Sequence, residues 1–198
     1  MVSLNSKKEF VLLLFTNSGK AIDFYFASKD WKENDLWRIF LSFSFLAPLA
    51  KFLQNLTFYF LGSIFEQFEL EKGLVDGLLS SWILVMLPVL LAYACDQVRM
   101  HSKFVPSTEK EPQPHLIFLS FLPFAGAGIF FVFPSPIVFL PLAASFLYCL
   151  QNSYIVLNQK LNYRTTDFFQ VWLKTGIIFL ALGIPFTFAF WFFRAVFQ

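Results

Sequence analysis

The longest uncharged stretch of this chain, residues 116–159, most constrains what the chain can fold into. It runs 44 residues without Asp, Glu, Lys or Arg, and Phe, Leu, Ile, Val and Ala dominate it. A hydrocarbon core about 30 Å thick is crossed by about 20 apolar residues in a helix that rises about 1.5 Å per residue. The stretch is therefore long enough for two crossings. The segment Phe133-Pro134-Ser135-Pro136 provides a reversal, because proline removes a backbone donor and disfavours a helical conformation at the preceding residue.

The remainder of the chain has the same apolar bias, which argues against a soluble core. Of its 198 residues, 57% are hydrophobic, only 14% are charged and 30 are Phe, and the mean hydropathy is +0.62. This composition predicts an all-α integral membrane protein that crosses the bilayer several times. A net charge of +2 is too small to indicate nucleic acid as a partner. Cys95 and Cys149 lie inside apolar segments, which excludes a disulfide framework.

Apolar segments predict a bundle of five transmembrane helices, a domain covering residues 39–198. The spans are expected at about 39–62, 78–95, 116–133, 136–157 and 175–196. The first span contains Pro48 and Lys51, and an unpaired lysine at the centre of a bilayer costs about 2.5–3.5 kcal/mol. About ten Phe and Leu side chains, at about −0.3 to −0.6 kcal/mol each, outweigh that cost. The segment Thr165-Thr166-Asp167 resembles a helix start, with Thr166 or Asp167 as the N-cap.

Residues 1–38 are expected to form a polar, interfacial segment before the bundle. Aromatic residues alternate there with lysine and arginine, a mixture typical of a segment that lies in the headgroup region. A flexible polar leader is the alternative. Lys7 and Lys8 precede an apolar run of six residues, which is too short for the core of a signal peptide, so no cleavage is expected.

The basic residues predict the orientation of the five spans. With the N-terminus in the cytoplasm, twelve of the 15 basic residues lie in cytoplasmic segments and only Lys72 lies in an outside segment. This is the bias that the positive-inside rule describes, so the N-terminus is expected in the cytoplasm and the C-terminus outside. The twelve are Lys7, Lys8, Lys20, Lys29, Lys32, Arg38, Arg99, Lys103, Lys110, Lys160, Arg164 and Lys174.

Six polar residues within or beside the spans are candidates for an intramembrane cluster. Lys51, Gln54 and Asn55 share one helical face, and the other members lie near the ends of the second and fourth spans. These side chains could line a polar vestibule, in which Lys51 could pair with Asp96. The alternative is that Asp96 marks the water boundary while the amides hydrogen-bond between helices. The cluster comprises Lys51, Gln54, Asn55, Asp96, Asn152 and Tyr154.

A second candidate site is a basic, aromatic face on the cytoplasmic side, formed by the N-terminal segment and the two polar loops. Anionic lipid would strengthen its binding by about 1 kcal/mol for each well-placed Lys or Arg. The expected partners are the lipid bilayer and either other membrane proteins or a second copy of the chain. The face comprises Lys29, Lys32, Arg38, Arg99, Lys103, Arg164 and Lys174.

Patterns that carry catalysis are absent from the sequence. Its two histidines, His101 and His115, lie in one loop without cysteines or carboxylates at the spacing of a zinc site. There is no Gly-rich phosphate loop, no Gly-x-Ser-x-Gly elbow and no His-Glu-x-x-His. We therefore expect a protein that is not an enzyme and has no metal or cofactor.

The order of parts resembles the Yip family of five-span membrane proteins, named for interaction with Rab-type GTPases, and most of all its bacterial branch. The resemblance rests on Leu46-Ala47-Pro48 in the first span, Pro114-His115-Leu116 before the third, and the short loop 157–164 before the last helix. Asp35-Leu36-Trp37 is a partial counterpart of the Asp-Leu-Tyr-Gly-Pro signature of eukaryotic members, so no GTPase-binding residue is carried over.

The resemblance implies a scaffold or adaptor in the inner (cytoplasmic) membrane of a bacterium, without enzymatic activity. Such a protein would associate with other membrane proteins or lipids. The alternative function is a small transporter, with the six-residue polar cluster along its path, or an accessory subunit of a transporter or other membrane complex.

Overall fold

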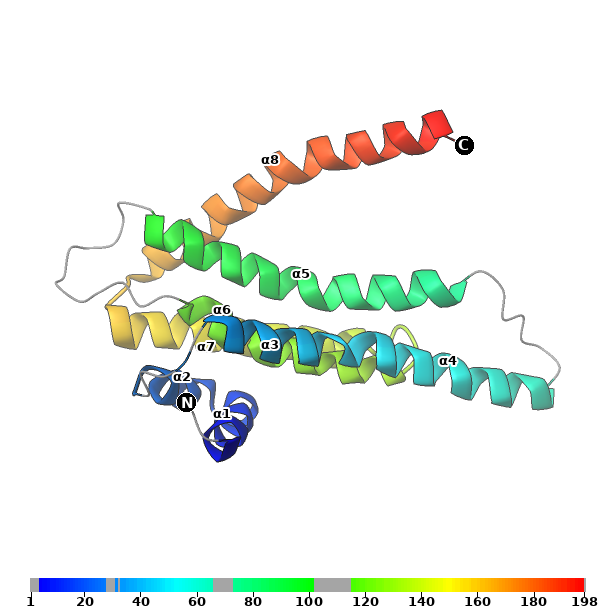
Figure 1. Cartoon of the computed structure of the whole chain (residues 1–198). Helices are drawn as coiled ribbons and strands as arrows, with labels where there is room; N and C mark the ends of the chain where they lie inside the picture. The colour runs from blue at the N-terminus through cyan, green and yellow to red at the C-terminus, as the bar shows by residue number, and fades with distance from the viewer. Residues whose placement is uncertain (1–3, 28–30, 32, 66–72, 102–114, 198) are drawn as a thin grey trace.

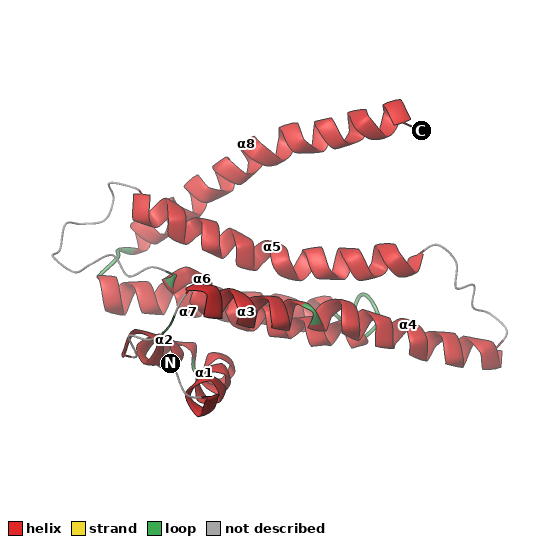
Figure 2. Cartoon of the chain, viewed as in Figure 1, coloured by secondary structure: helices red, strands yellow, loops and turns green. Residues whose placement is uncertain are grey.

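The computed structural model describes residues 4–27, 31, 33–65, 73–101 and 115–197, and over these ranges it contains helices and no strand (Figures 1 and 2). The expectation of an all-α chain is therefore confirmed. The elements are α1 (Leu4–Thr16), α2 (Ser18–Ala27), α3 (Glu33–Ser44), α4 (Leu46–Phe65), α5 (Gly73–His101), α6 (Leu116–Gly126), the 3-10 helix η1 (Ala127–Val132), α7 (Phe139–Leu161) and α8 (Thr165–Phe197).

Four helical segments in the described part of the chain are long and apolar enough to cross a membrane. They are Asn34–Leu61, Gly77–His101, Phe139–Gln159 and Thr165–Pro185. A fifth apolar segment, Leu116–Val132, is shorter than these four. By length and composition this is a helical membrane protein, and the first candidate span begins at Asn34 where residue 39 was expected.

The first span is built from two helices, α3 and α4, that follow one another almost without interruption. Pro48 explains the break, because its ring has no N–H and clashes with the carbonyl four residues earlier, at Ser44. The hydrogen bonds from the N–H of Phe45 to Leu41 (3.3 Å) and from the N–H of Leu49 to Phe45 (3.2 Å) carry the helix across the break. The two helices therefore form one rod in Figure 1.

Helix α6 is the centre of the bundle. All eleven of its residues are buried, and α1, α2, α3, α5 and α7 pack against it. A helix that is apolar on every side is typical of a protein core or a membrane span, and the composition of residues 116–126 fits this central position. With a rise of about 1.5 Å per residue in α6 and about 2.0 Å in η1, the two together extend about 28 Å.

The N-terminal segment belongs to the same core. Phe10, Leu14, Ile22 and Tyr25 are buried, and the ring of Phe10 lies 4.5 Å from that of Trp31 between centroids. In Figure 1, α1 and α2 lie on the side of the bundle opposite to α8. Residues 4–27 are thus two packed helices, and the alternative of a flexible leader does not describe them.

Two ends of the bundle are used as landmarks below. At the Asp96 end, α5 and α7 finish and α6 and α8 begin; it lies to the left in Figure 1. At the Lys51 end, the proline-containing turn that was expected to reverse the chain connects η1 to α7.

Among the described side chains of the last helix, α8, those that pack in the interior lie near its start. The chain turns into it at Asn162, whose left-handed conformation (φ 51°) suits a helix C-terminus. Phe168, Val171 and Thr175 are buried, but beyond Thr175 no described side chain of α8 is buried. Figure 1 shows this part of α8 diverging from α5.

Candidate functional site

A buried ion pair joins Asp96 and Arg99 on α5. Their exposed fractions are 0% and 1%. Oδ1 of Asp96 accepts hydrogen bonds from Nε of Arg99 at 3.2 Å and from a terminal guanidinium nitrogen at 3.1 Å. The spacing of three residues places both side chains on one face of α5, which makes the pair possible.

The second oxygen of Asp96 binds the start of α6. Oδ2 accepts a hydrogen bond from the backbone N–H of Phe118 at 2.8 Å. The first N–H groups of a helix have no partner within that helix, and the helix dipole favours an anion there. His115, at the N-cap position, has a left-handed conformation and makes no side-chain cap. The carboxylate of α5 therefore acts as the cap of α6.

Aromatic side chains surround this ion pair. Tyr93 stacks on His115 with 5.9 Å between ring centroids and 9° between ring planes, and it also contacts Trp37 and Phe118. Tyr163, from the loop between α7 and α8, is buried beside Arg99. Burial raises the pKa of the Tyr163 phenol, and the Arg99 guanidinium opposes that rise only in part, so the phenol is neutral near pH 7.

We call Asp96, Arg99, Tyr163 and the N-terminus of α6 the polar junction. It joins α5, α6 and the loop before α8. The Asp96 carboxylate accepts three hydrogen bonds and is paired with a cation, so its oxygens are already engaged. Breaking a buried pair is strongly unfavourable because one charge is left uncompensated. The geometry suits holding helices together, not donating or accepting protons.

A second polar feature lies at the Lys51 end. The ammonium group of Lys51 donates a hydrogen bond to Oε1 of the buried Gln54. Lys51 lines a cavity of about 170 Å³ together with three serines, Ser80, Ser81 and Ser135. The hydroxyls of Ser80 and Ser81 donate to the backbone carbonyls of Gly77 and Leu78, so Lys51 is the chief donor that faces this cavity.

The structure does not bring the six predicted polar residues together. Lys51 lies near Gly77 at the start of α5, whereas Asp96 lies nineteen residues further along the same helix, a separation of about 28 Å. Lys51 therefore does not pair with Asp96 in this structure. The side chain of Asp96 is fully buried within the protein, so it does not itself face water. Gln54 and Asn55 follow Lys51 on α4, and neither approaches Asp96.

The two candidates on α7 have other roles. The hydroxyl of Tyr154 lies 2.8 Å from Oγ1 of Thr165 and its ring contacts Phe168, which joins α7 to the first turn of α8. The side-chain nitrogen of Asn152 is buried without a hydrogen-bond partner among the described residues. Neither residue hydrogen-bonds to Asp96.

The predicted basic face is only partly present. Arg38 and Arg164 are exposed and Lys174 is half-buried, but Arg99 is buried in the polar junction and cannot be a surface contact. A buried guanidinium needs a carboxylate beside it, and Asp96 fulfils that need. Lys29, Lys32 and Lys103 lie outside the described residues.

The start of α8 also differs from the expected cap. The helix begins at Thr165, and Oδ2 of Asp167 accepts a hydrogen bond at 3.2 Å from the N–H of Arg164. This is the backward half of a capping box, in which the N3 side chain binds the N-cap backbone. Arg164, not Thr166 or Asp167, therefore occupies the N-cap position.

Sequence reasoning missed the partner of Asp96. The spacing Asp96-x-x-Arg99 at the end of an apolar helix was a visible signal for an ion pair on one face. The contribution of Phe118 and Tyr163 had no such signal, because both lie far from Asp96 along the sequence. No group of three or more His, Cys, Asp or Glu residues that could hold a metal occurs within the described ranges.

Comparisons with known proteins add no assignment. No family model matches this chain, and no curated protein or solved structure matches it either.

Proposed function

We infer that this chain is a non-enzymatic scaffold or adaptor that crosses the membrane five times and associates with other membrane proteins or lipids. The fifth crossing is the segment Leu116–Val132. Its length of about 28 Å is close to the hydrocarbon thickness of about 30 Å, because a 3-10 helix rises further per residue than an α-helix. The segment is followed by a turn and then by α7, which runs back toward the Asp96 end, and this hairpin supports a full crossing.

The arrangement of the helix ends supports an N-terminus in the cytoplasm. Arg38 and Arg164 lie near the starts of α3 and α8, at the end of the bundle that this orientation places in the cytoplasm, where the positive-inside rule favours basic residues. The Asp96 end would therefore be cytoplasmic. The order of parts, which resembles the bacterial branch of the Yip family, favours the inner (cytoplasmic) membrane of a bacterium.

The topology is tested by labelling single cysteines with a membrane-impermeant maleimide in intact cells, in a background without Cys95 and Cys149. A cysteine appended to the C-terminus should react from outside, and one at the N-terminus should react only after the cells are opened. Reaction of both ends from the same side would contradict five spans.

The distal half of α8 carries the proposal of a scaffold. Leu180, Leu182 and Phe188 are 64%, 69% and 73% exposed. An added Cβ at Gly176 would meet no atom within 4 Å, so this helix leaves room for another helix to approach. Association within a membrane depends on close packing and small residues, since lipid tails solvate apolar surface as well as protein does. A span that its own bundle leaves uncovered is suited to a partner membrane protein.

Photo-crosslinking in cells tests this assignment. Benzoylphenylalanine at Leu182 should give discrete adducts with protein, whereas the same group at Leu140 of α7, which is 75% exposed, should give only lipid adducts. Both positions lie toward the Lys51 end. Identical adduct patterns at the two positions would mean that α8 is covered by lipid alone.

A transporter, or an accessory subunit of one, is the second candidate, and the cavity beside Lys51 favours it. That cavity opens at one end of the bundle, and the polar junction occupies the other. A flux measurement in liposomes decides between the two functions, because transport through this cavity requires Lys51, and Lys51→Met would abolish it. A scaffold would show no flux with either protein.

A further inference from the structure

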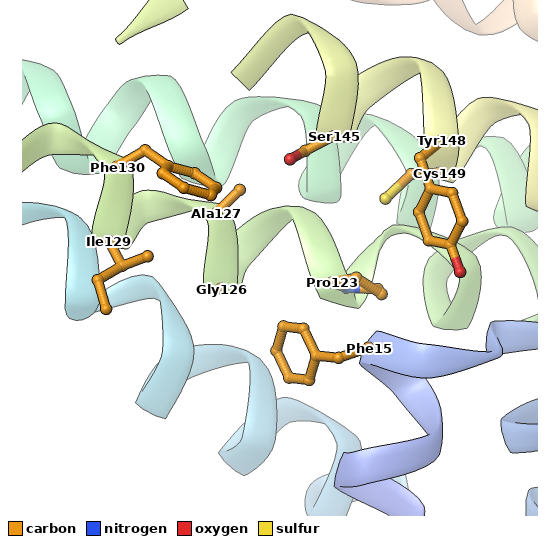
Figure 3. A pocket seen from close by; sticks show the side chains of 9 residues that line it. All are labelled: Phe15, Pro123, Gly126, Ala127, Ile129, Phe130, Ser145, Tyr148 and Cys149. Carbon is orange, nitrogen blue, oxygen red and sulfur yellow. The ribbon is translucent and has the colours of Figure 1, made fainter. Parts of the chain in front are cut away.

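A second cavity, of about 290 Å³, lies where α1, α6, η1 and α7 meet (Figure 3). Apolar side chains form most of its wall. Figure 3 shows Phe15 of α1 across the cavity from Ser145 and Cys149 of α7, with Phe130 of η1 at one side. None of the described residues that line it is charged.

The cavity lies near the middle of the bundle's length. Gly126, in its wall, is ten residues after the start of α6, a distance of about 15 Å. Tyr148, on the opposite wall, is nine residues after the start of α7, a distance of about 14 Å. The cavity therefore lies about midway along the hairpin of α6, η1 and α7. If this hairpin crosses the hydrocarbon twice, as in the proposed function, that is the middle of a layer about 30 Å thick, where water is scarce.

Phe15 covers the cavity from the side of α1. A Cβ added to Gly126 would lie 2.4 Å from the Phe15 ring, so the absence of a side chain at Gly126 is what lets the ring dock. The ring also meets Phe43 of α3 edge-on, with 5.1 Å between centroids. Phe15 is nevertheless 41% exposed, and the neighbouring Ile129 is 54% exposed, so the cavity opens sideways out of the bundle.

An apolar cavity of this kind has one natural occupant at this depth. Empty space deprives its walls of dispersion contacts, and an apolar cavity does not bind water well. Its volume is at the lower end of ligand pockets, which span about 300–1,000 Å³, so it accommodates part of a chain and not a whole lipid. The headgroup of a bilayer lipid lies about 15 Å away, at half the hydrocarbon thickness.

We propose that this cavity is a binding site for one acyl chain of a membrane phospholipid, which enters sideways beneath Phe15. The site rests on the membrane location in the proposed function but not on the scaffold role. The acyl-chain site is tested by lipid adducts near Tyr148, and the scaffold role is tested by protein adducts at Leu182. Either proposal can therefore fail without the other.

The test uses the full chain in nanodiscs that contain a phosphatidylcholine with a diazirine in the middle of one acyl chain. After illumination, peptide mass spectrometry should locate adducts on the cavity wall, at Phe130, Ser145 or Tyr148. A phosphatidylcholine with the diazirine beside the carbonyl should not label these residues, because its reactive group stays near the headgroup. Equal labelling by the two lipids would overturn the proposal, and this comparison requires no variant.

A matched pair of variants provides the second arm. Ser145→Phe fills the cavity and should reduce the adducts at Phe130 to the background of the unilluminated sample. Ala144→Phe adds the same ring at the next position of α7, which is exposed and outside the cavity, and should leave the adducts unchanged. Unchanged adducts in a folded Ser145→Phe protein would show that no chain occupies this site.

Discussion

Oδ2 of Asp96 accepts a hydrogen bond from the N–H of Phe118 at 2.8 Å, so that a side chain of α5 caps the N-terminus of α6. The same carboxylate holds Arg99 through its other oxygen. One buried residue thus fixes how the central helix meets its neighbour. Since other helices pack against α6 on every side, we expect loss of the Asp96 carboxylate to lower the stability of the bundle as a whole.

Asp96→Ala should lower the free energy of unfolding by about 3–5 kcal/mol, because it leaves the buried Arg99 cation uncompensated. The measurement is a denaturation curve in mixed micelles. Asp167→Ala is the matched control, since it removes a carboxylate that caps a helix near the surface and should cost about 1 kcal/mol. Similar losses in the two variants would contradict a special role for the junction.

The double variant Asp96→Leu, Arg99→Met should be more stable than Asp96→Ala although it changes more atoms. It removes both buried charges at once, and apolar replacement of a buried pair is often close to neutral. It should remain below the natural protein by about 1–3 kcal/mol, because the N–H of Phe118 keeps no acceptor. Full recovery would show that the cap contributes nothing.

Gly128→Ala should destabilise the fold by about 1–3 kcal/mol through overpacking. Its new Cβ would lie 2.8 Å from Cβ and 2.9 Å from the backbone nitrogen of Ala47, and a backbone atom cannot rotate away. Gly176→Ala is the control in open space, and its added methyl should leave stability unchanged or raise it by up to about 1 kcal/mol. Thermal unfolding followed by tryptophan fluorescence distinguishes the two.

Stability should fall as the pH rises above the ordinary pKa of tyrosine, near 10. The pKa of Tyr163 is raised in the folded chain, so above pH 10 the unfolded chain releases this proton while the folded chain still holds it. The unfolded state then binds fewer protons, and the free energy of unfolding decreases with pH. Tyr163→Phe should show a smaller decrease between pH 9 and about 11. Superimposable pH profiles for the two proteins would contradict this.

Some structural features of this protein could be predicted from its sequence, and others could not. Helical content and the reversal at the prolines depend on residues close together in the chain. Pro134 and Pro136 stop a helix wherever they occur, and the structure has its turn there. The N-terminal segment was harder to predict, because α1 and α2 pack against α6, about a hundred residues later.

The candidate sites show the same limit. Polar residues in apolar spans were recognised as unusual, but hydropathy does not indicate which of them meet. Lys51 of α4 lies beside the start of α5, whereas Asp96 lies near the end of that helix. Arg99 looked like a surface cation because a basic loop follows it, whereas its position three residues after Asp96 makes it part of the interior.

The sequence by itself determined that this chain is helical and built for a membrane, because apolar composition and proline positions act locally and need no partner. Only the tertiary structure decided which helix lies at the centre and which charges are compensated. The reason is that burial and ion pairing are relations between segments distant in sequence: Asp96 becomes a cap only when the N–H of Phe118 is brought to within 2.8 Å of it.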